Sequence, residues 1–150
     1  MFHPSNKTHR SSFVCTHSLF GALRRYKPVE VFVGITSAAG LIAADKGGTS
    51  DPFAKLKMNG HEYHTATLHK TINPVWGQEF AWRGKRTTML ADPLHIKVFD
   101  DDVFSKDDKL GEINLDLNPL LDQLDENEKL ELDVNLDTQG TVKLTLRWIW

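Results

Sequence analysis

Hydrophobic and polar residues alternate with a period of two along most of the chain from residue 28 onward. The clearest run lies near the end, where Val142, Leu144, Leu146 and Trp148 alternate with threonine, lysine and arginine residues. This alternation is typical of a β-strand that packs one face on a core and exposes the other to water. The same pattern occurs in Val29–Ile35, Leu94–Val98, Ile113–Leu117 and Leu130–Leu136. The chain is therefore expected to consist mainly of strands.

Three further segments complete a predicted set of about eight strands. They are Phe53–Met58, Tyr63–His69 and Trp76–Trp82. The connecting segments are rich in Gly, Asn, Asp, Pro and Ser, which favour turns. Many short strands joined by such turns predict an all-β fold, an eight-stranded antiparallel β-sandwich. One short helix is also expected, with Asn118 as its N-cap and Pro119 at its first position.

The composition fits one globular domain. Of the 150 residues, 40% are hydrophobic and 25% are charged, and no apolar run reaches the ~18 residues of a membrane-spanning helix. The net charge of −2 argues against a nucleic-acid partner. The single cysteine, Cys15, has no partner for an internal disulfide, which favours a reducing compartment.

Positive charge is concentrated at the beginning of the chain. Residues 1–27 contain five Lys and Arg residues and no Asp or Glu, so the remaining residues carry a net charge of −7. This difference divides the chain into a basic N-terminal arm (1–27), which we expect to be flexible, and a β-sandwich domain (28–150). One hypothesis for the arm is docking on a membrane through its apolar residues.

Five aspartates occupy two of the predicted turns. Asp45 and Asp51 flank a segment rich in Gly and Ser, and Asp100, Asp102 and Asp108 belong to a second turn. Crowded carboxylates repel one another, and a divalent cation relieves this repulsion. Ca²⁺ fits better than Mg²⁺, because it takes about 6–8 oxygen ligands with flexible geometry. The residues alone leave two interpretations open, a calcium site or acidic turns that are only solvated.

Several other kinds of site are not supported. An EF-hand counted from Asp100 would need Gly at its sixth position and Glu at its twelfth, but Ser105 and Gly111 stand there. His61 and His64 differ by three positions, which places them on opposite faces of a strand and argues against a zinc site. The chain has no GxSxG, Walker A or GxGxxG motif. We therefore expect that the protein is not an enzyme.

Three motifs, in order along the chain, resemble those of the C2 domain family. Residues 41–53 (LIAADKGGTSDPF) are similar to its first calcium-binding loop and the strand that follows. Residues 73–80 (NPVWGQEF) are similar to its NPxWNExF segment, and residues 98–111 (VFDDDVFSKDDKLG) to its third loop. The resemblance covers about residues 28–150. It implies an eight-stranded C2-like sandwich, with calcium-binding loops at one end and the permuted, type II order of strands.

The resemblance also implies a set of calcium ligands. The five aspartates that the family uses are all present: Asp45, Asp51, Asp100, Asp102 and Asp108. Ser105 falls at the position of an auxiliary oxygen ligand, and the backbone carbonyls of Ala44, Lys46 and Asp101 are further expected donors. Two bound Ca²⁺ ions are expected, with one or three as alternatives.

The function that the resemblance implies is calcium-dependent binding to anionic phospholipid. Val103 and Phe104 are expected to insert into the membrane, and Lys46 to meet a phosphate. Lys55 matches a basic strand face that binds inositol lipids in some family members, and His64 stands where such a face would have a lysine. We expect a cytoplasmic protein that attaches reversibly to membranes. The alternative is a calcium-independent module that holds a protein partner.

Overall fold

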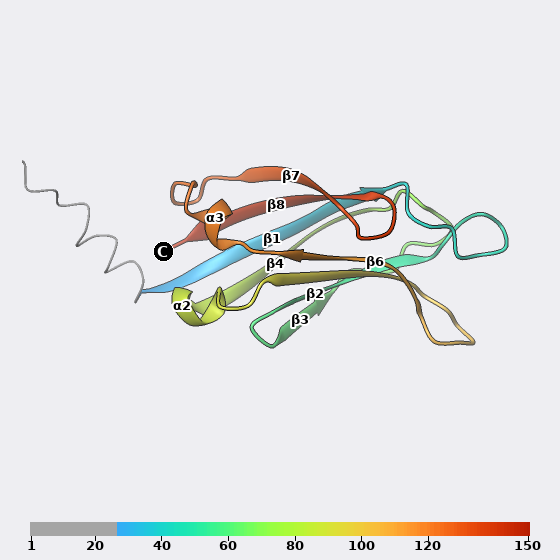
Figure 1. The fold of residues 1–150 in the computed structure, drawn as a ribbon, viewed down its shortest axis with the longest axis horizontal. Helices are drawn as coiled ribbons and strands as arrows, with labels where there is room; N and C mark the ends of the chain where they lie inside the picture. Colours follow the sequence, from blue (N-terminus) through green and yellow to red (C-terminus); the bar gives the residue numbers. More distant parts are fainter. Residues whose placement is uncertain (1–26) are drawn as a thin grey trace, which may run out of the picture.

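The computed structural model describes residues 27–150, which fold into eight strands and two short helices. The strands form two four-stranded antiparallel sheets that pack face to face (Figure 1). The predicted all-β, eight-stranded antiparallel sandwich is confirmed. The predicted arm lies outside the described residues, apart from Lys27. In chain order the elements are β1 (Pro28–Ala39), β2 (Pro52–Met58), β3 (His61–His64), β4 (Val75–Lys85), α2 (Arg86–Met89), β5 (Leu94–Asp100), β6 (Asp108–Leu115), α3 (Asn118–Leu121), β7 (Leu130–Asn135) and β8 (Thr141–Ile149).

The order of strands brings distant parts of the sequence together. One sheet has the order β4-β1-β8-β7 and the other β3-β2-β5-β6. The last strand, β8, therefore lies between β1 and β7, and Val33 of β1 pairs with Leu146 of β8 on one side and with Phe80 of β4 on the other. The last strand thus lies beside the first, and the assignment of this order to the type II topology stays a prediction.

The core lies between the sheets and is built by the alternating residues of the sequence pattern. In β1, Val31, Val33 and Ile35 have no exposed surface, and in β8 Leu144 and Leu146 are equally buried. Burying each such side chain stabilises the fold by about 1.5–3 kcal/mol relative to leaving it in water. The period-two pattern is therefore explained by packing on one face of each sheet.

The prediction for the third strand was wrong in its bounds. The strand ends at His64, and the chain from Thr65 onward turns back toward the start of β2. There the amide of Leu68 donates to the carbonyl of Pro52 (3.1 Å), and the amide of Thr71 donates to the carbonyl of Ser50 (2.8 Å). These backbone hydrogen bonds replace strand pairing, so residues 65–74 form a loop, the β3–β4 loop.

The helices also differ from the sequence-based expectation. Asn118 is the first helical residue rather than the N-cap, a position that belongs to Leu117. The Asn118 side-chain amide donates to the carbonyl of Leu90 (2.9 Å) instead of capping the helix. The helix α2 was not predicted, and its four residues bury Met89 against the core. None of the helices in residues 27–150 is long and apolar enough to cross a membrane.

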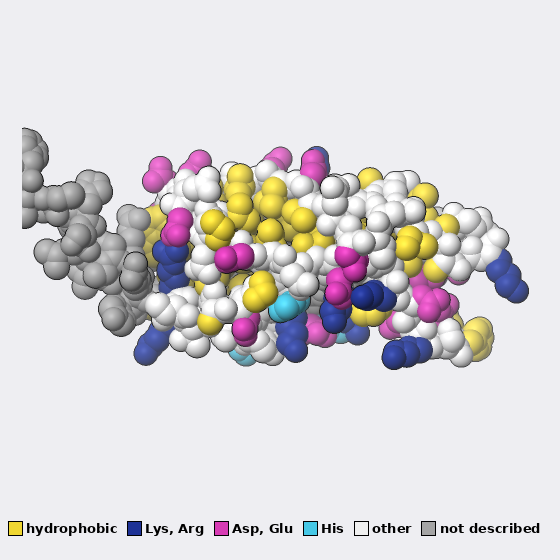
Figure 2. Space-filling model, in the orientation of Figure 1, with side chains coloured by type: hydrophobic (Ala, Val, Ile, Leu, Met, Phe, Trp, Pro, Cys, Tyr) yellow, Lys and Arg dark blue, Asp and Glu magenta, His cyan; other side chains and the backbone are white. Residues whose placement is uncertain are grey.

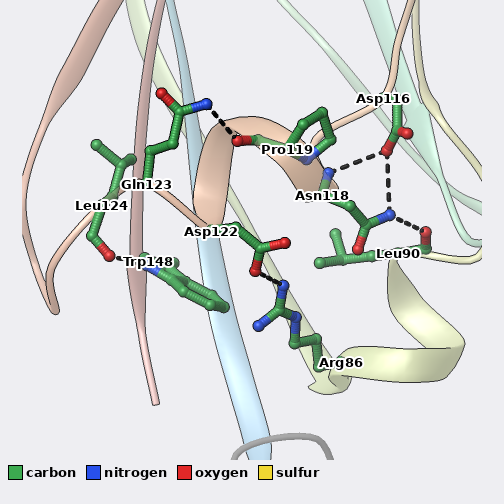
Figure 3. A network of polar contacts seen from close by, with 9 residues as sticks. All are labelled: Arg86, Leu90, Asp116, Asn118, Pro119, Asp122, Gln123, Leu124 and Trp148. Carbon is green, nitrogen blue, oxygen red and sulfur yellow. Dashed lines mark hydrogen bonds and ion pairs between the residues drawn. The ribbon is translucent and has the colours of Figure 1, made fainter. Parts of the chain in front are cut away.

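A network of polar contacts fixes the two helices at one end of the sandwich (Figure 3). Arg86 of α2 forms an ion pair with Asp122, just after α3. Its guanidinium group also lies 4.7 Å from the centre of the Trp148 ring, and the Trp148 indole donates to the carbonyl of Leu124 (3.4 Å). The loops that contain the five aspartates lie at the opposite end (Figure 1).

Candidate metal centre

Three carboxylates from two separate parts of the chain converge at this end of the sandwich. Asp45 belongs to the β1–β2 loop (residues 40–51), whereas Asp100 ends β5 and Asp102 lies in the β5–β6 loop (residues 101–107). One oxygen from each carboxylate lies within 4.8 Å of the others. Calcium–oxygen distances are 2.3–2.6 Å, so two ligands of one ion lie at most about 5.2 Å apart. The three carboxylates therefore fit a single calcium ion.

The β1–β2 loop holds Asp45 through its backbone. The amide of Asp45 donates to the carbonyl of Thr49 (2.9 Å), and the amide of Gly48 donates back to the carbonyl of Asp45 (3.1 Å). Gly48 has φ of +78°, a conformation that glycine adopts without steric cost. The hydroxyl of Ser50, which is fully buried, accepts from the amide of Ala44 (2.9 Å) and donates to the carbonyl of Ile42 (2.8 Å). The Asp45 carboxylate is exposed, but the loop that supports it is hydrogen-bonded at both ends.

Asp100 is the buried member of the cluster, with 2% of its surface exposed. One of its oxygens accepts a hydrogen bond from the amide of Asp51 at 2.5 Å. Burial raises the pKa of Asp100 above its ordinary value, and the negative charges of Asp45 and Asp102 raise it further, against the lowering effect of that hydrogen bond. A buried carboxylate with like charges beside it is stabilised by a cation. The electrostatics of the cluster and the distances between its carboxylates therefore both suit a bound cation.

Asp51 faces a different part of the loop end. Its carboxylate lies 2.9 Å from Nδ1 of His69 and accepts a hydrogen bond from the amide of Lys70 at 2.7 Å. The hydrogen bond with His69, followed by that with Lys70, lowers the pKa of Asp51. Both partners belong to the β3–β4 loop. The Asp51 carboxylate is therefore ionised and is fixed by His69 and Lys70, but it is not one of the three converging carboxylates.

The other predicted ligands also lie outside the three-carboxylate cluster. Asp108 is exposed at the start of β6, where it pairs in register with Asp100. The carboxylate of Asp101 accepts from the hydroxyl of Thr67 (2.9 Å). Ser105, Lys46 and Ala44 are exposed in their loops. The structure thus places all of these residues at one end of the sandwich and brings Asp45, Asp100 and Asp102 into direct proximity.

Sequence reasoning missed the contribution of the β3–β4 loop. Thr67, His69 and Lys70 contact Asp51 or Asp101, which are 18 to 34 positions away in the sequence. Local spacing contains no signal for such contacts, because they depend on how the loop folds back over β2. Lys70 also lines an open hollow of about 710 Å³ together with Asp45, Lys46 and Asp51.

Comparison with known proteins decides the family. The sequence pattern that defines the C2 domain matches residues 29–133. The chain belongs to the C2 domain family. A multiple C2 and transmembrane domain-containing protein of Drosophila melanogaster is 34% identical over 122 residues, which cover 79% of this chain and 12% of that protein. The human multiple C2 and transmembrane domain-containing protein 1 is 43% identical over 81 residues, which cover 53% of this chain and 8% of that protein.

Solved structures agree with this family. A C2 domain of plant extended synaptotagmin 1 superimposes with a TM-score of 0.68 at 25% identity, over 80% of this chain and 93% of that domain. A calcium-bound structure of two C2 domains of extended synaptotagmin 2 has a TM-score of 0.70 at 22% identity, over 82% of this chain and 46% of that one. The chain spans about a tenth of the length of the curated relatives named above.

The apolar tip of this C2 domain lies in the β5–β6 loop. The exposed fraction is 85% for Val103 and 101% for Phe104, so neither side chain packs against the domain. Figure 2 shows a hydrophobic group at the tip of the lower of the two loops, with acidic side chains just behind it and Lys or Arg side chains nearby.

The predicted basic face lies on the sheet formed by β3, β2, β5 and β6. Nζ of Lys55 lies 4.9 Å from the centre of the Phe99 ring and 5.6 Å from that of Phe53. Lys57 and Lys97 line one hollow together with Lys55. The ring of His64 lies 6.3 Å from that of Phe53. Nε2 of His64 lies 2.7 Å from a carboxylate oxygen of Glu62. The negative charge of Glu62 offsets part of the positive charge that the lysines give to this face.

Proposed function

We propose that this C2 domain binds Ca²⁺ and, once loaded, attaches to anionic phospholipid membranes as a peripheral module in the cytoplasm. The observation that carries this proposal is the convergence of Asp45, Asp100 and Asp102 at the end that also exposes Val103 and Phe104. Membership of the C2 family supports it. Ion binding and membrane contact would then occur at one end of the molecule.

The proposed ion site uses the full predicted set of ligands. Asp45, Asp100 and Asp102 would share the first ion. The backbones of Asp51 and Asp108 flank this cluster, through the amide hydrogen bond of Asp51 to Asp100 and the register pairing of Asp108 with Asp100. Their carboxylates would serve a second ion. Ser105 and the backbone carbonyls of Ala44, Lys46 and Asp101 would complete the shells, because Ca²⁺ takes about 6–8 oxygens. Two Ca²⁺ ions would nearly cancel the charge of five carboxylates, which removes the repulsion between the loops and an anionic membrane.

The proposed membrane contact combines charge and a small apolar insertion. Phe104 and Val103 would enter the interfacial region, with a gain of about 25 cal/mol per Å² of apolar surface removed from water. Lys46, exposed beside Asp45, would meet a lipid phosphate. Lys55 and His64 would give a second, weaker contact on the sheet face, because Glu62 competes for His64. The attachment is therefore reversible and weakens with salt.

The experiment is co-sedimentation with liposomes, with and without phosphatidylserine, in Ca²⁺ or in a chelator. Binding that requires both Ca²⁺ and phosphatidylserine supports the proposal. Binding in the chelator would move the site to the Lys55 face or to the arm and would contradict the calcium switch. No binding in either condition would contradict the membrane role and favour the alternative, a calcium-independent module for a protein partner. A variant with Asp45→Asn and Asp102→Asn is the matched control, since it removes charge from the cluster alone.

A further inference from the structure

One edge of the sandwich exposes an apolar strip far from the proposed calcium site. Its members are partly buried hydrophobic side chains that pack against the core with one side only. We call them the edge strip: Leu115, Leu120, Leu124, Leu130, Leu132 and Val134. Figure 2, in the orientation of Figure 1, shows hydrophobic side chains gathered between β7 and β6. These strands are the outer strands of their sheets on this side of the sandwich.

The two sheets contact each other directly toward the loop end of this edge. There the amide of Asp137 donates to the carbonyl of Glu112 (3.1 Å), and the amide of Glu112 donates to the Asp137 carboxylate (2.6 Å). A Cβ on Gly111 would lie 2.6 Å from the hydroxyl oxygen of Thr138, so the approach is tight. Leu136 is accordingly buried, whereas Leu132, nearer the helices, is only half-buried. Most of the strip therefore lies nearer the helices than these contacts between the sheets.

The same edge has the strongest negative charge of the chain. Residues 112–137 contain nine acidic residues and one basic residue, a net charge of −8, while the whole chain has −2. Asp116, Asp125, Glu131 and Asp133 are all exposed. Figure 2 shows acidic side chains along this border of the molecule. A partner for the edge strip must therefore combine apolar and basic side chains.

Residues 1–26 of this chain have that composition. They contain four Lys and Arg residues, no acidic residue, and the apolar residues Phe13, Val14, Leu19, Phe20 and Leu23. The chain also enters the domain at the correct end. Pro28 pairs with Lys85, and the next residue, Arg86, forms an ion pair with Asp122 of the acidic segment. Phe13 is 14 residues from Lys27, and 14 residues span up to about 46 Å, which exceeds the ~20 Å of a six-residue strand such as β7.

We propose that residues 13–25 dock on the edge strip of the same molecule. In this arrangement their aromatic and leucine side chains cover the edge strip, and Arg24 and Arg25 lie beside the acidic residues of segment 112–137. The docking requires neither Ca²⁺ nor lipid, because no residue of the loop end takes part in it.

The single cysteine of the chain provides a direct test. A nitroxide attached to Cys15 in the isotopically labelled 150-residue chain broadens the amide signals of nearby residues in NMR spectra. In the presence of a chelator, we expect at least a twofold loss of intensity for residues 115–121 and 130–134, which reduction of the label restores. Signals from β2 and β3 should keep their intensity.

Charge reversals distinguish docking from random collisions of the arm. The variant Arg24→Glu with Arg25→Glu should lose at least half of the broadening, and so should Glu131→Lys with Asp133→Lys. Combining the four substitutions should restore it. The pair Lys55→Glu with Lys57→Glu, on β2 and another face, is the matched control and should leave it unchanged.

Three outcomes would overturn the proposal. One is the absence of broadening on β6, α3 and β7, or its appearance on another face instead. A second is broadening that the charge reversals do not alter. The third concerns a mixture of two kinds of chain, one with the nitroxide but no isotope label and the other with the isotope label but no nitroxide. Equal broadening in this mixture would show that the arm of a second copy occupies the strip.

Discussion

The backbone amide of Asp51 donates a hydrogen bond to the carboxylate of Asp100, a residue 49 positions later in the sequence. The carbonyl of Asp51 in turn accepts from the amide of Asp101 at 3.0 Å. These two bonds join the β1–β2 loop to the start of the β5–β6 loop. The end of the β1–β2 loop is thus tied to Asp100 before an ion binds, which reduces the cost of ordering the loops.

The first prediction concerns the ion ligands. Replacing Asp45 and Asp102 together with asparagine should lower calcium affinity at least 100-fold, because the site loses two of its three converging charges. The fold should persist, since neither side chain belongs to the core. Isothermal titration calorimetry measures the affinity. The control variant Glu131→Gln with Asp133→Asn removes two charges from β7. An equal loss of calcium affinity in this control would show that the affinity depends only on the net charge of the protein.

A second prediction separates membrane insertion from ion binding. Phe104→Ala should weaken binding to phosphatidylserine liposomes about tenfold, in line with a partial loss of the 1.5–3 kcal/mol that full burial of a large apolar side chain provides. Its calcium affinity without lipid should not change, because the ring contacts none of the aspartates. Ile149→Ala is the control, since Ile149 is also exposed (36%) but lies at the end of β8, paired with Glu30 and away from the loops. Equal liposome binding by wild type and Phe104→Ala would exclude Phe104 as an insertion anchor.

A third prediction follows from the buried carboxylate of Asp100. Its raised pKa means that the folded protein holds this proton more tightly than the unfolded chain does. The stabilising contribution is therefore present at low pH and is lost as pH rises through the folded pKa, above the ordinary value of 3.8. At neutral pH the charged carboxylate destabilises the calcium-free protein.

Asp100→Asn removes this charge and can keep the hydrogen bond from Asp51. In a chelator at pH 7 it should raise the free energy of unfolding by about 1 kcal/mol, a shift of a few degrees in Tm. In saturating Ca²⁺ the order should reverse, because the variant lacks one carboxylate ligand and ion binding stabilises it less than the wild type. Thermal unfolding in both conditions measures this. The control is Asp108→Asn, at an exposed position, which should leave the free energy of unfolding in chelator unchanged. If Asp100→Asn were less stable than the wild type in chelator, the prediction would be wrong.

A fourth prediction concerns the end opposite the loops. Arg86→Ala should lower the free energy of unfolding by about 1–2 kcal/mol, because it removes the ion pair with Asp122 and the stacking on Trp148. Arg86→Lys should recover only part of this loss, since lysine lacks the planar group. Urea denaturation measures both variants. Calcium affinity should stay the same in each, and a change in affinity would show that the two ends are coupled.

Most of the fold follows from the local sequence pattern. A period of two in the hydrophobic residues correctly placed the strands around Val31, Ile96 and Leu144, whose burial confirms them. The pattern failed for residues 65–69, because this segment turns back toward the start of β2, where the amide of Leu68 donates to the carbonyl of Pro52. It also failed to predict α2, whose position depends on contacts with Asp122 and Trp148, far along the chain.

For the candidate site, the sequence indicates the chemistry, whereas the geometry depends on the tertiary structure. Five aspartates in two turns already indicated an oxygen-ligand cation site. Spacing along the chain could not show that Asp45, Asp100 and Asp102 converge while Asp51 turns toward His69 and Lys70. The reason is physical: distances between carboxylates on different loops depend on strand register and on hydrogen bonds between the loops. Both are fixed only when the two sheets have packed.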